Sequence, residues 1–183
     1  MGTLGDILIL DEPKIALFCS VKCPGKIILD TYDLARRFRE EGITIVSGFH
    51  SPMEQECLRI LLRSPHPIIW CLARGLLRRI PLKPVDCRAA IAENRLLFIS
   101  QFPDKVRRVT AKSATIRNRL VADMAVAVVV AHAAPGSKME TLCREILSAG
   151  KPLYTFDHPA NAAIISAGAR LITPETDWAL ICP

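Results

Sequence analysis

The sequence predicts an α/β fold, with a doubly wound, mostly parallel sheet and helices on both faces. Short apolar runs alternate with amphipathic stretches along almost the whole chain. Most of the runs are apolar at successive positions rather than at every second one, which is typical of parallel strands buried on both faces. Right-handed crossovers between such strands then place helices on both sides of the sheet.

Each predicted strand is a short run rich in apolar residues. The run AVAVVVA at 125–131 is the clearest, and Pro67 stands at the first position of its strand, where a missing N–H is tolerated. The predicted strands cover residues 15–20, 43–47, 67–72, 96–100, 125–131, 152–156 and 170–173.

The predicted helices lie between these strands. In the first of them, Leu34 and Phe38 recur at helical spacing while Arg36 and Glu40 face water, and Gly42 is a natural stop. The predicted helices cover residues 27–41, 52–63, 85–94, 113–124 and 138–149, followed by shorter ones at 161–167 and 174–180.

Length and composition predict a single domain over residues 1–183. The chain is 50% hydrophobic, which excludes intrinsic disorder and suits a sizeable core. Its longest apolar run, residues 124–134, is about half of the ~20 residues that a membrane-spanning helix needs. No secretory signal opens the sequence. We therefore expect a cytoplasmic protein that does not contact a membrane.

Seven cysteines are scattered along the chain without a C-x-x-C pair. This spacing is atypical of a disulfide framework or a structural zinc site. We expect most of them to be small core residues with free thiols. No metal site is predicted.

The net charge of +6 is unevenly distributed. Residues 59–119 hold 14 Lys or Arg against three acidic residues, a net charge of +11, and the remainder sums to −5. Such asymmetry indicates either an anionic partner, nucleic acid first, or a solvated helix face. Charge alone leaves both readings open.

Four loops follow the predicted strands at the carboxyl edge of the sheet, at 20–25, 47–52, 73–75 and 132–138. Small residues in each allow backbone N–H groups to approach an anion at a helix N-terminus. None matches G-x-G-x-x-G or G-x-x-x-x-G-K-[ST], so phosphate binding is predicted without a named nucleotide or cofactor. His50 and His132 also follow strands, where a hydrogen-bonded structural role is the commoner one. Glu54 is expected in the first turn of a helix.

The triplet Arg117-Asn118-Arg119 falls within a predicted helix. Residues two apart on a helix point roughly opposite ways. We expect one arginine to reach the sheet edge, where its fork suits phosphate oxygens, and the other to face solvent or a partner.

Together these features resemble the DNA-processing protein A family (DprA, also called Smf), which has a Rossmann-like fold. The likeness runs over residues 15–178. Cys19-Ser20-Val21-Lys22 stands where the family has Gly-Ser-Arg, and Ser47-Gly48 matches its Ser-Gly turn. Ala73-Arg74-Gly75-Leu76 followed by Pro81 resembles its Gly-Cys-Gly-Leu segment, and Arg117-Asn118-Arg119 is intact.

The resemblance implies a protein that binds single-stranded DNA in a basic pocket, hands it to the RecA recombinase, dimerises and is not an enzyme. Residues 50–54 depart from the family's Ala-Arg-Gly-Ile-Asp, and His132 replaces its usual glutamate. Many members also carry further terminal domains. We therefore predict a divergent, stand-alone core that binds single-stranded DNA at the carboxyl edge of the sheet. The predicted contacts are Ser20, Lys22, Ser47, Gly48, Arg74, Gly75, Arg117, Asn118, Arg119, Gly136 and Ser137.

Two alternatives remain at this point. The same superfold is similar to the LOG (lysine decarboxylase-like) phosphoribohydrolases, which act on nucleoside monophosphates. Of their Pro-Gly-Gly-x-Gly-Thr motif only Pro135-Gly136 is kept. The other alternative is an interaction protein whose basic segment docks an acidic partner.

Overall fold

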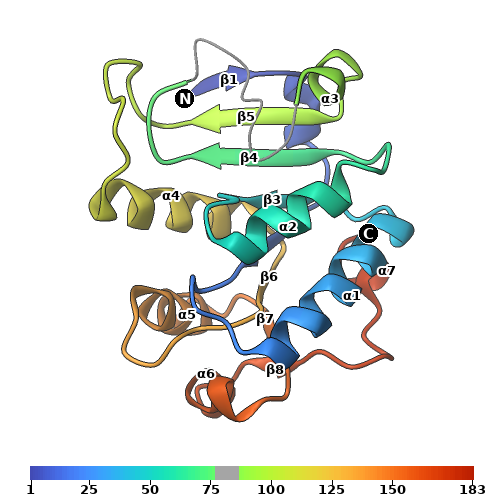
Figure 1. Ribbon diagram of the computed structural model, residues 1–183, viewed down its shortest axis with the longest axis vertical. Coiled ribbons are helices and arrows are strands. Elements are labelled where there is room, and N and C mark those ends of the chain that lie inside the picture. The colour runs from blue at the N-terminus through green and yellow to red at the C-terminus, as the bar shows by residue number, and fades with distance from the viewer. Residues whose placement is uncertain (77–86) are drawn as a thin grey trace.

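The computed structural model describes residues 1–76 and 87–183 (Figure 1). Within them, one eight-stranded sheet has the order β1-β5-β4-β3-β2-β6-β7-β8. All neighbouring strands are parallel except β1 and β5. The predicted α/β class and the mostly parallel sheet are confirmed.

Apart from β1, the strands are short and lie within the runs that predict them. Val126, for example, belongs to the run 125–131 but is 44% exposed, and the paired strand begins one residue later. The strands are β1 (Gly2–Leu4), β2 (Ile15–Phe18), β3 (Ile45–Ser47), β4 (Ile68–Leu72), β5 (Leu96–Ser100), β6 (Ala127–Val130), β7 (Leu153–Thr155) and β8 (Arg170–Leu171).

The helices also fall where the sequence predicts them, within a few residues. Gly42 ends the first with a φ of 73°, a left-handed conformation that glycine adopts at no steric cost. The α-helices are α1 (Gly25–Glu41), α2 (Pro52–Leu61), α3 (Arg88–Ala92), α4 (Ala111–Met124), α5 (Lys138–Ser148), α6 (Ala162–Ser166) and α7 (Trp178–Ile181).

Two predictions need correction, and a third falls partly outside the described residues. The prediction missed β1 and the 3₁₀ helix η1 (Ile7–Leu10), because so short a segment shows no period and pairs only through tertiary contact, with Gly2 opposite Ser100. The last helix begins at Trp178 rather than Pro174, because Asp177 caps it by accepting from the Leu180 N–H. Residues 85–86 of the predicted helix 85–94, and Pro81, lie outside the described residues.

Two hydrophobic clusters cover the two faces of the sheet. Along β2, Ile15 and Leu17 face the cluster built with α1, α2, α3 and α7, while Ala16 and Phe18 face the one built with α4, α5 and α6. Complete burial of β2 on both faces explains its uninterrupted apolar sequence. Six of the seven free cysteines are buried, as expected.

The sheet reverses its direction of growth at β2. From this strand the chain builds outward through β3, β4 and β5, and it then returns to place β6, β7 and β8 on the other side. The loops after β2 and β6 therefore diverge onto opposite faces, which opens a crevice at the carboxyl edge. In Figure 1 the arrowheads of β4 and β5 point toward this edge, beside α4.

No helix in the described part of the chain is both long enough and apolar enough to cross a membrane.

Candidate functional site

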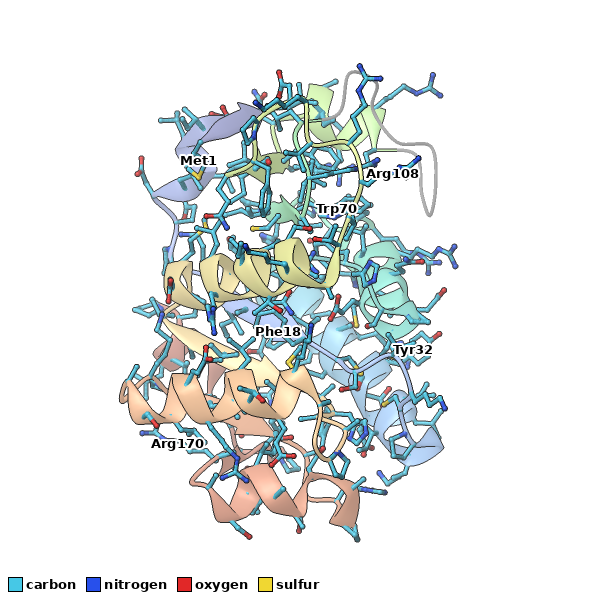
Figure 2. The ribbon with its side chains drawn as sticks, turned by 90° about the vertical axis from the view of Figure 1, so that its left-hand side faces the viewer. Met1, Phe18, Tyr32, Trp70, Arg108 and Arg170 are labelled. Carbon is cyan, nitrogen blue, oxygen red and sulfur yellow. The ribbon has the colours of Figure 1, made fainter. Side chains whose placement is uncertain are left out.

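A cleft of about 420 Å³ opens at the carboxyl edge, at the point where the sheet reverses. We call it the main cleft. Figure 2 looks onto this edge. Loops after β2, β3 and β6 form its walls together with α4 and the start of α5. Its basic and amide-bearing lining residues are Lys22, Arg117, Asn118 and Lys138.

Glu54 joins the loops after β2 and β3. Its carboxylate accepts hydrogen bonds from the backbone N–H groups of Cys19 (3.0 Å), His50 (2.7 Å) and Ser51 (3.3 Å). Ser51 caps α2 in return by accepting from the Glu54 N–H. The sequence predicts Glu54 in the first turn of this helix, and the structure confirms it. The bond to Cys19, 35 residues away, is what the sequence could not indicate.

Ser20 joins the loops after β2 and β6. Its N–H donates to the His132 carbonyl (2.9 Å), and its hydroxyl accepts from the Ala134 N–H (3.0 Å). The His132 ring is buried against the Asn161 amide, with 3.0 Å between Nδ1 and Oδ1. The structural role expected for His132 is confirmed.

Arg117 lies at the floor of the main cleft and is only 5% exposed. Its Nε donates to Asn118 Oδ1 (2.7 Å) and its Nη1 donates to the Cys71 carbonyl (3.2 Å). Burial lowers the pKa of Arg117, while the nearby Glu54 carboxylate and Cys71 thiol oppose that shift. Among the described residues its Nη2 group has no hydrogen-bond partner, so it can donate to a ligand.

Glycine at position 48 makes room for this guanidinium. A Cβ there would lie 1.6 Å from Arg117 Nη1. The Gly48 carbonyl accepts from the Trp70 indole N–H (2.9 Å), which fixes the turn. A residue without a side chain is thus needed at position 48 to leave room for the Arg117 guanidinium.

A second, smaller cleft of about 230 Å³ lies on the other side of Arg117. We call it the side cleft. It lies where β3 and β4 end, and Arg74, Val109 and His50 are among its lining residues. Because His50 and Arg117 line both clefts, the main cleft and the side cleft adjoin each other.

Arg119 points away from both clefts. It forms a two-pronged ion pair with Glu145 of α5, at 2.8 and 2.7 Å. This pair lies at a groove of about 170 Å³ between α4 and α5. Glu145 raises the pKa of Arg119, and Arg119 lowers the pKa of Glu145. The expectation that the two arginines of the triplet face different ways is confirmed.

A match to a known protein family covers almost the whole chain. Residues 2–180 match the protein family described as DNA recombination-mediator protein A. The chain belongs to this family. The DprA resemblance seen in the sequence is therefore confirmed over almost the whole chain. A search of curated proteins gives no match.

Solved structures of DprA proteins share the fold of this chain, including its Rossmann-like sheet. DNA processing protein A of Streptococcus pneumoniae has a TM-score of 0.76 at 20% identity, over 93% of this chain and 62% of its own length. The Helicobacter pylori protein, described for its single-stranded DNA binding mode, has a TM-score of 0.78 at 22% identity, over 98% and 83%. A molybdenum cofactor binding protein from Rippkaea orientalis has a TM-score of 0.62 at 15% identity, over 93% and 95%. The chain thus spans less than two thirds of the pneumococcal DprA.

The structure brings together some of the contacts predicted from the DprA resemblance. Ser20, Lys22, Arg117, Asn118 and Ser137 line the main cleft. The side cleft is lined by Gly48 and Arg74 together with Arg117. Arg119 lines the groove between α4 and α5, where Asn118 also reaches.

Three predicted positions line none of these three hollows. The Ser47 hydroxyl is buried between the Leu17 carbonyl, to which it donates, and the Phe49 N–H, from which it accepts. Gly75 packs under Pro103, whose carbonyl would lie 2.5 Å from an added Cβ. The N–H of Gly136 donates to the Glu140 carboxylate at 2.7 Å.

The prediction did not single out Lys138 and Thr115, which line both the main cleft and the α4–α5 groove. Lys138 follows Ser137, which caps α5 by accepting from the Glu140 N–H. A capping serine after a strand signals a helix N-terminus, so the position of Lys138 could have been read from it.

No group of three or more His, Cys, Asp or Glu side chains in residues 1–76 and 87–183 could hold a metal ion.

Proposed function

We propose that this DprA-family protein binds single-stranded DNA by lodging backbone phosphates in the main cleft. The observation that carries the proposal is the buried Arg117, which lines the cleft and whose Nη2 group has no hydrogen-bond partner among the described residues. A buried charge is costly unless an opposite charge or hydrogen bonds satisfy it. A phosphate oxygen supplies both.

The other charges of the cleft support an anionic ligand. Lys22 and Lys138 are exposed at its rim and pair with no acid in the described part of the chain. The acid in the cleft, Glu54, already accepts three backbone N–H groups. Two free cations above a buried guanidinium suit the repeated charges of a nucleic-acid backbone.

The test is the salt dependence of binding. We expect a fluorescent oligo(dT) to bind with an affinity that falls log-linearly with salt, by a slope of about −0.7 per phosphate contact. Lys22→Gln with Lys138→Gln removes two contacts and lowers the slope by about 1.4. An affinity that is flat between low and moderate salt contradicts the proposal.

The matched control removes two exposed charges elsewhere. Arg63→Gln with Arg170→Gln changes the net charge by the same amount, at residues that line none of the three hollows. We expect this control to keep the wild-type salt slope.

Release of a free base from a nucleoside monophosphate, measured on the same sample, would instead assign a LOG-like hydrolase.

The proposal extends to partners, on the strength of the family's description as a recombination mediator. We propose a RecA-type recombinase as protein partner, a homodimer in solution and a cytoplasmic location. Residues 1–183 are proposed to act as one domain, because a single sheet joins strands from Gly2 to Leu171. Light scattering measures the dimer, and RecA filament assembly on coated DNA measures mediation.

A further inference from the structure

A basic segment lies beside the side cleft, in the loop after β5 and the first turn of α4. We give this name to four exposed cations, Lys105, Arg107, Arg108 and Lys112. None of them forms an ion pair within the described part of the chain, although Asp104 is a sequence neighbour. Such a row of unpaired cations along one short segment is the electrostatic footprint of a polyanion.

The segment is anchored at its root to the strand ends below it. The Gly75 N–H donates to the Val106 carbonyl (2.8 Å), and the Ser100 hydroxyl donates to the Arg74 carbonyl (2.6 Å). Gly75 has no room for a Cβ under Pro103 and Asp104. The loop therefore holds a fixed place over the ends of β4 and β5.

The side cleft connects this segment to the main cleft. Val109, at the centre of the basic segment, lines the side cleft and is 46% exposed. Arg117 and His50 line the side cleft and the main cleft alike. Arg74 also lines the side cleft, and its guanidinium forms no ion pair with an acid among the described residues.

We infer that a single strand of DNA held in the main cleft continues past Arg117, through the side cleft and over the basic segment. The inference rests on the proposed function. Phosphates would follow the cations from Lys22 to Arg117, Arg74 and Arg108. The side cleft, lined by His50 and Val109 among others, would take a nucleobase between two phosphates. The footprint of the protein is then longer than the main cleft alone.

The test compares two oligo(dT) lengths on the intact protein. An oligonucleotide of about 4 nucleotides fills the main cleft, and one of about 12 nucleotides also reaches the basic segment. We expect wild-type protein to bind the longer one at least about tenfold more tightly, in excess of the statistical gain from additional registers. Arg107→Gln with Arg108→Gln removes most of this gain and lowers the salt slope for the longer DNA by about 1.4.

The control is again Arg63→Gln with Arg170→Gln. Figure 2 shows Arg170 and Arg108 at opposite ends of the molecule. We expect the control to keep the length-dependent gain. All four residues are exposed, and Arg170 gives up a hydrogen bond and a cation–π contact to Tyr154, so thermal melting is used to verify that both variants fold.

The outcomes separate the inference from the proposed function. If the short DNA binds and the Arg107 and Arg108 variant keeps the full gain with length, the inference is overturned and the proposed function stands. If the control loses as much affinity as the variant, the effect is one of net charge and the inference again fails. If neither length binds at low salt, the proposed function fails, and the inference with it.

Discussion

The two sides of helix α4 present the same residue type in opposite environments. On the inner side, Arg117 is 5% exposed, donates to a backbone carbonyl and leaves an Nη2 group without a partner in the described residues. On the outer side, Arg119 is exposed and both prongs of its guanidinium are paired with Glu145. Only two positions separate them.

The two arginines differ in whether the protein itself pairs their guanidinium groups. The pairing of Arg119 is complete without a ligand, and an exposed ion pair of this kind contributes little to stability. Arg117 bears the cost of burial without a contacting counter-ion, which a folded protein tolerates chiefly at a site that binds one. On this contrast rests our proposal that the ligand binds at the inner side of α4 and that the outer side has only a minor role.

The largest expected effect is that of Arg117→Met. Removing the guanidinium should lower the affinity for single-stranded DNA by at least about tenfold, because its donors to phosphate are lost. The free energy of unfolding should change by no more than about 1 kcal/mol, because two lost hydrogen bonds are offset by the relief of a desolvated charge. Fluorescence anisotropy and urea unfolding measure the two quantities.

Arg117→Lys serves as the control, because it keeps the charge and loses the fork. It should bind with an affinity between those of the wild type and Arg117→Met. A loss of stability above about 3 kcal/mol in Arg117→Met would make Arg117 a structural residue and remove the contrast with Arg119.

The next effect is that of Gly48→Ala. The new methyl group would occupy the place of Arg117 Nη1, so the guanidinium must move out of its position. We expect a loss of about 1–2 kcal/mol in stability and a roughly fivefold loss of DNA affinity. Combined with Arg117→Met the same change should cost much less, because the shorter side chain leaves room. A double-mutant cycle measures this coupling, and strict additivity would disprove it.

The smallest effect concerns Glu145. Glu145→Gln frees Arg119 and removes a negative charge from a groove that shares Asn118 and Lys138 with the main cleft. DNA affinity should rise, by less than about threefold, since the groups are exposed and screened by salt. A rise of tenfold or more, measured by the same anisotropy titration, would show that the outer side of α4 is a main contact.

Acid should act on this pair in a defined direction. Arg119 holds the pKa of Glu145 below its ordinary value of 4.5. The stabilising contribution of the pair is therefore fully present above pH 4.5 and is lost as the pH falls through the lowered pKa of Glu145. A titration of Glu145 by NMR in the wild type and in Arg119→Gln measures the shift, which should vanish in the variant.

Much of the fold is predictable because burial on both faces leaves a local signature. Residues 96–99 and 125–131 are all apolar, and in the structure β5 pairs in parallel with β4, and β6 with β2. The edge strand Gly2–Leu4 has no such signature, because its place is decided by pairing with β5. Tertiary contact, rather than pattern, determines that element.

The sequence predicts which side chains lie at the candidate site better than it predicts which of their hydrogen-bonding groups are already paired. Helical geometry alone separates Arg117 from Arg119, and the loops after strands locate the edge at which Ser20 and Lys22 lie. Which N–H groups remain free cannot be read from the sequence. Glu140 occupies the N–H of Gly136, and the Ser47 hydroxyl is buried between two backbone groups.

One carboxylate and one hydroxyl tie the walls of the main cleft together. Glu54 bonds the loop after β2 to the loop after β3, and Ser20 bonds it to the loop after β6. The walls are thus ordered before any ligand arrives, and little conformational entropy is left to lose on binding. Such a cleft needs no closing motion, so association should be limited by electrostatically steered diffusion and affinity differences between variants should appear mainly in the dissociation rate.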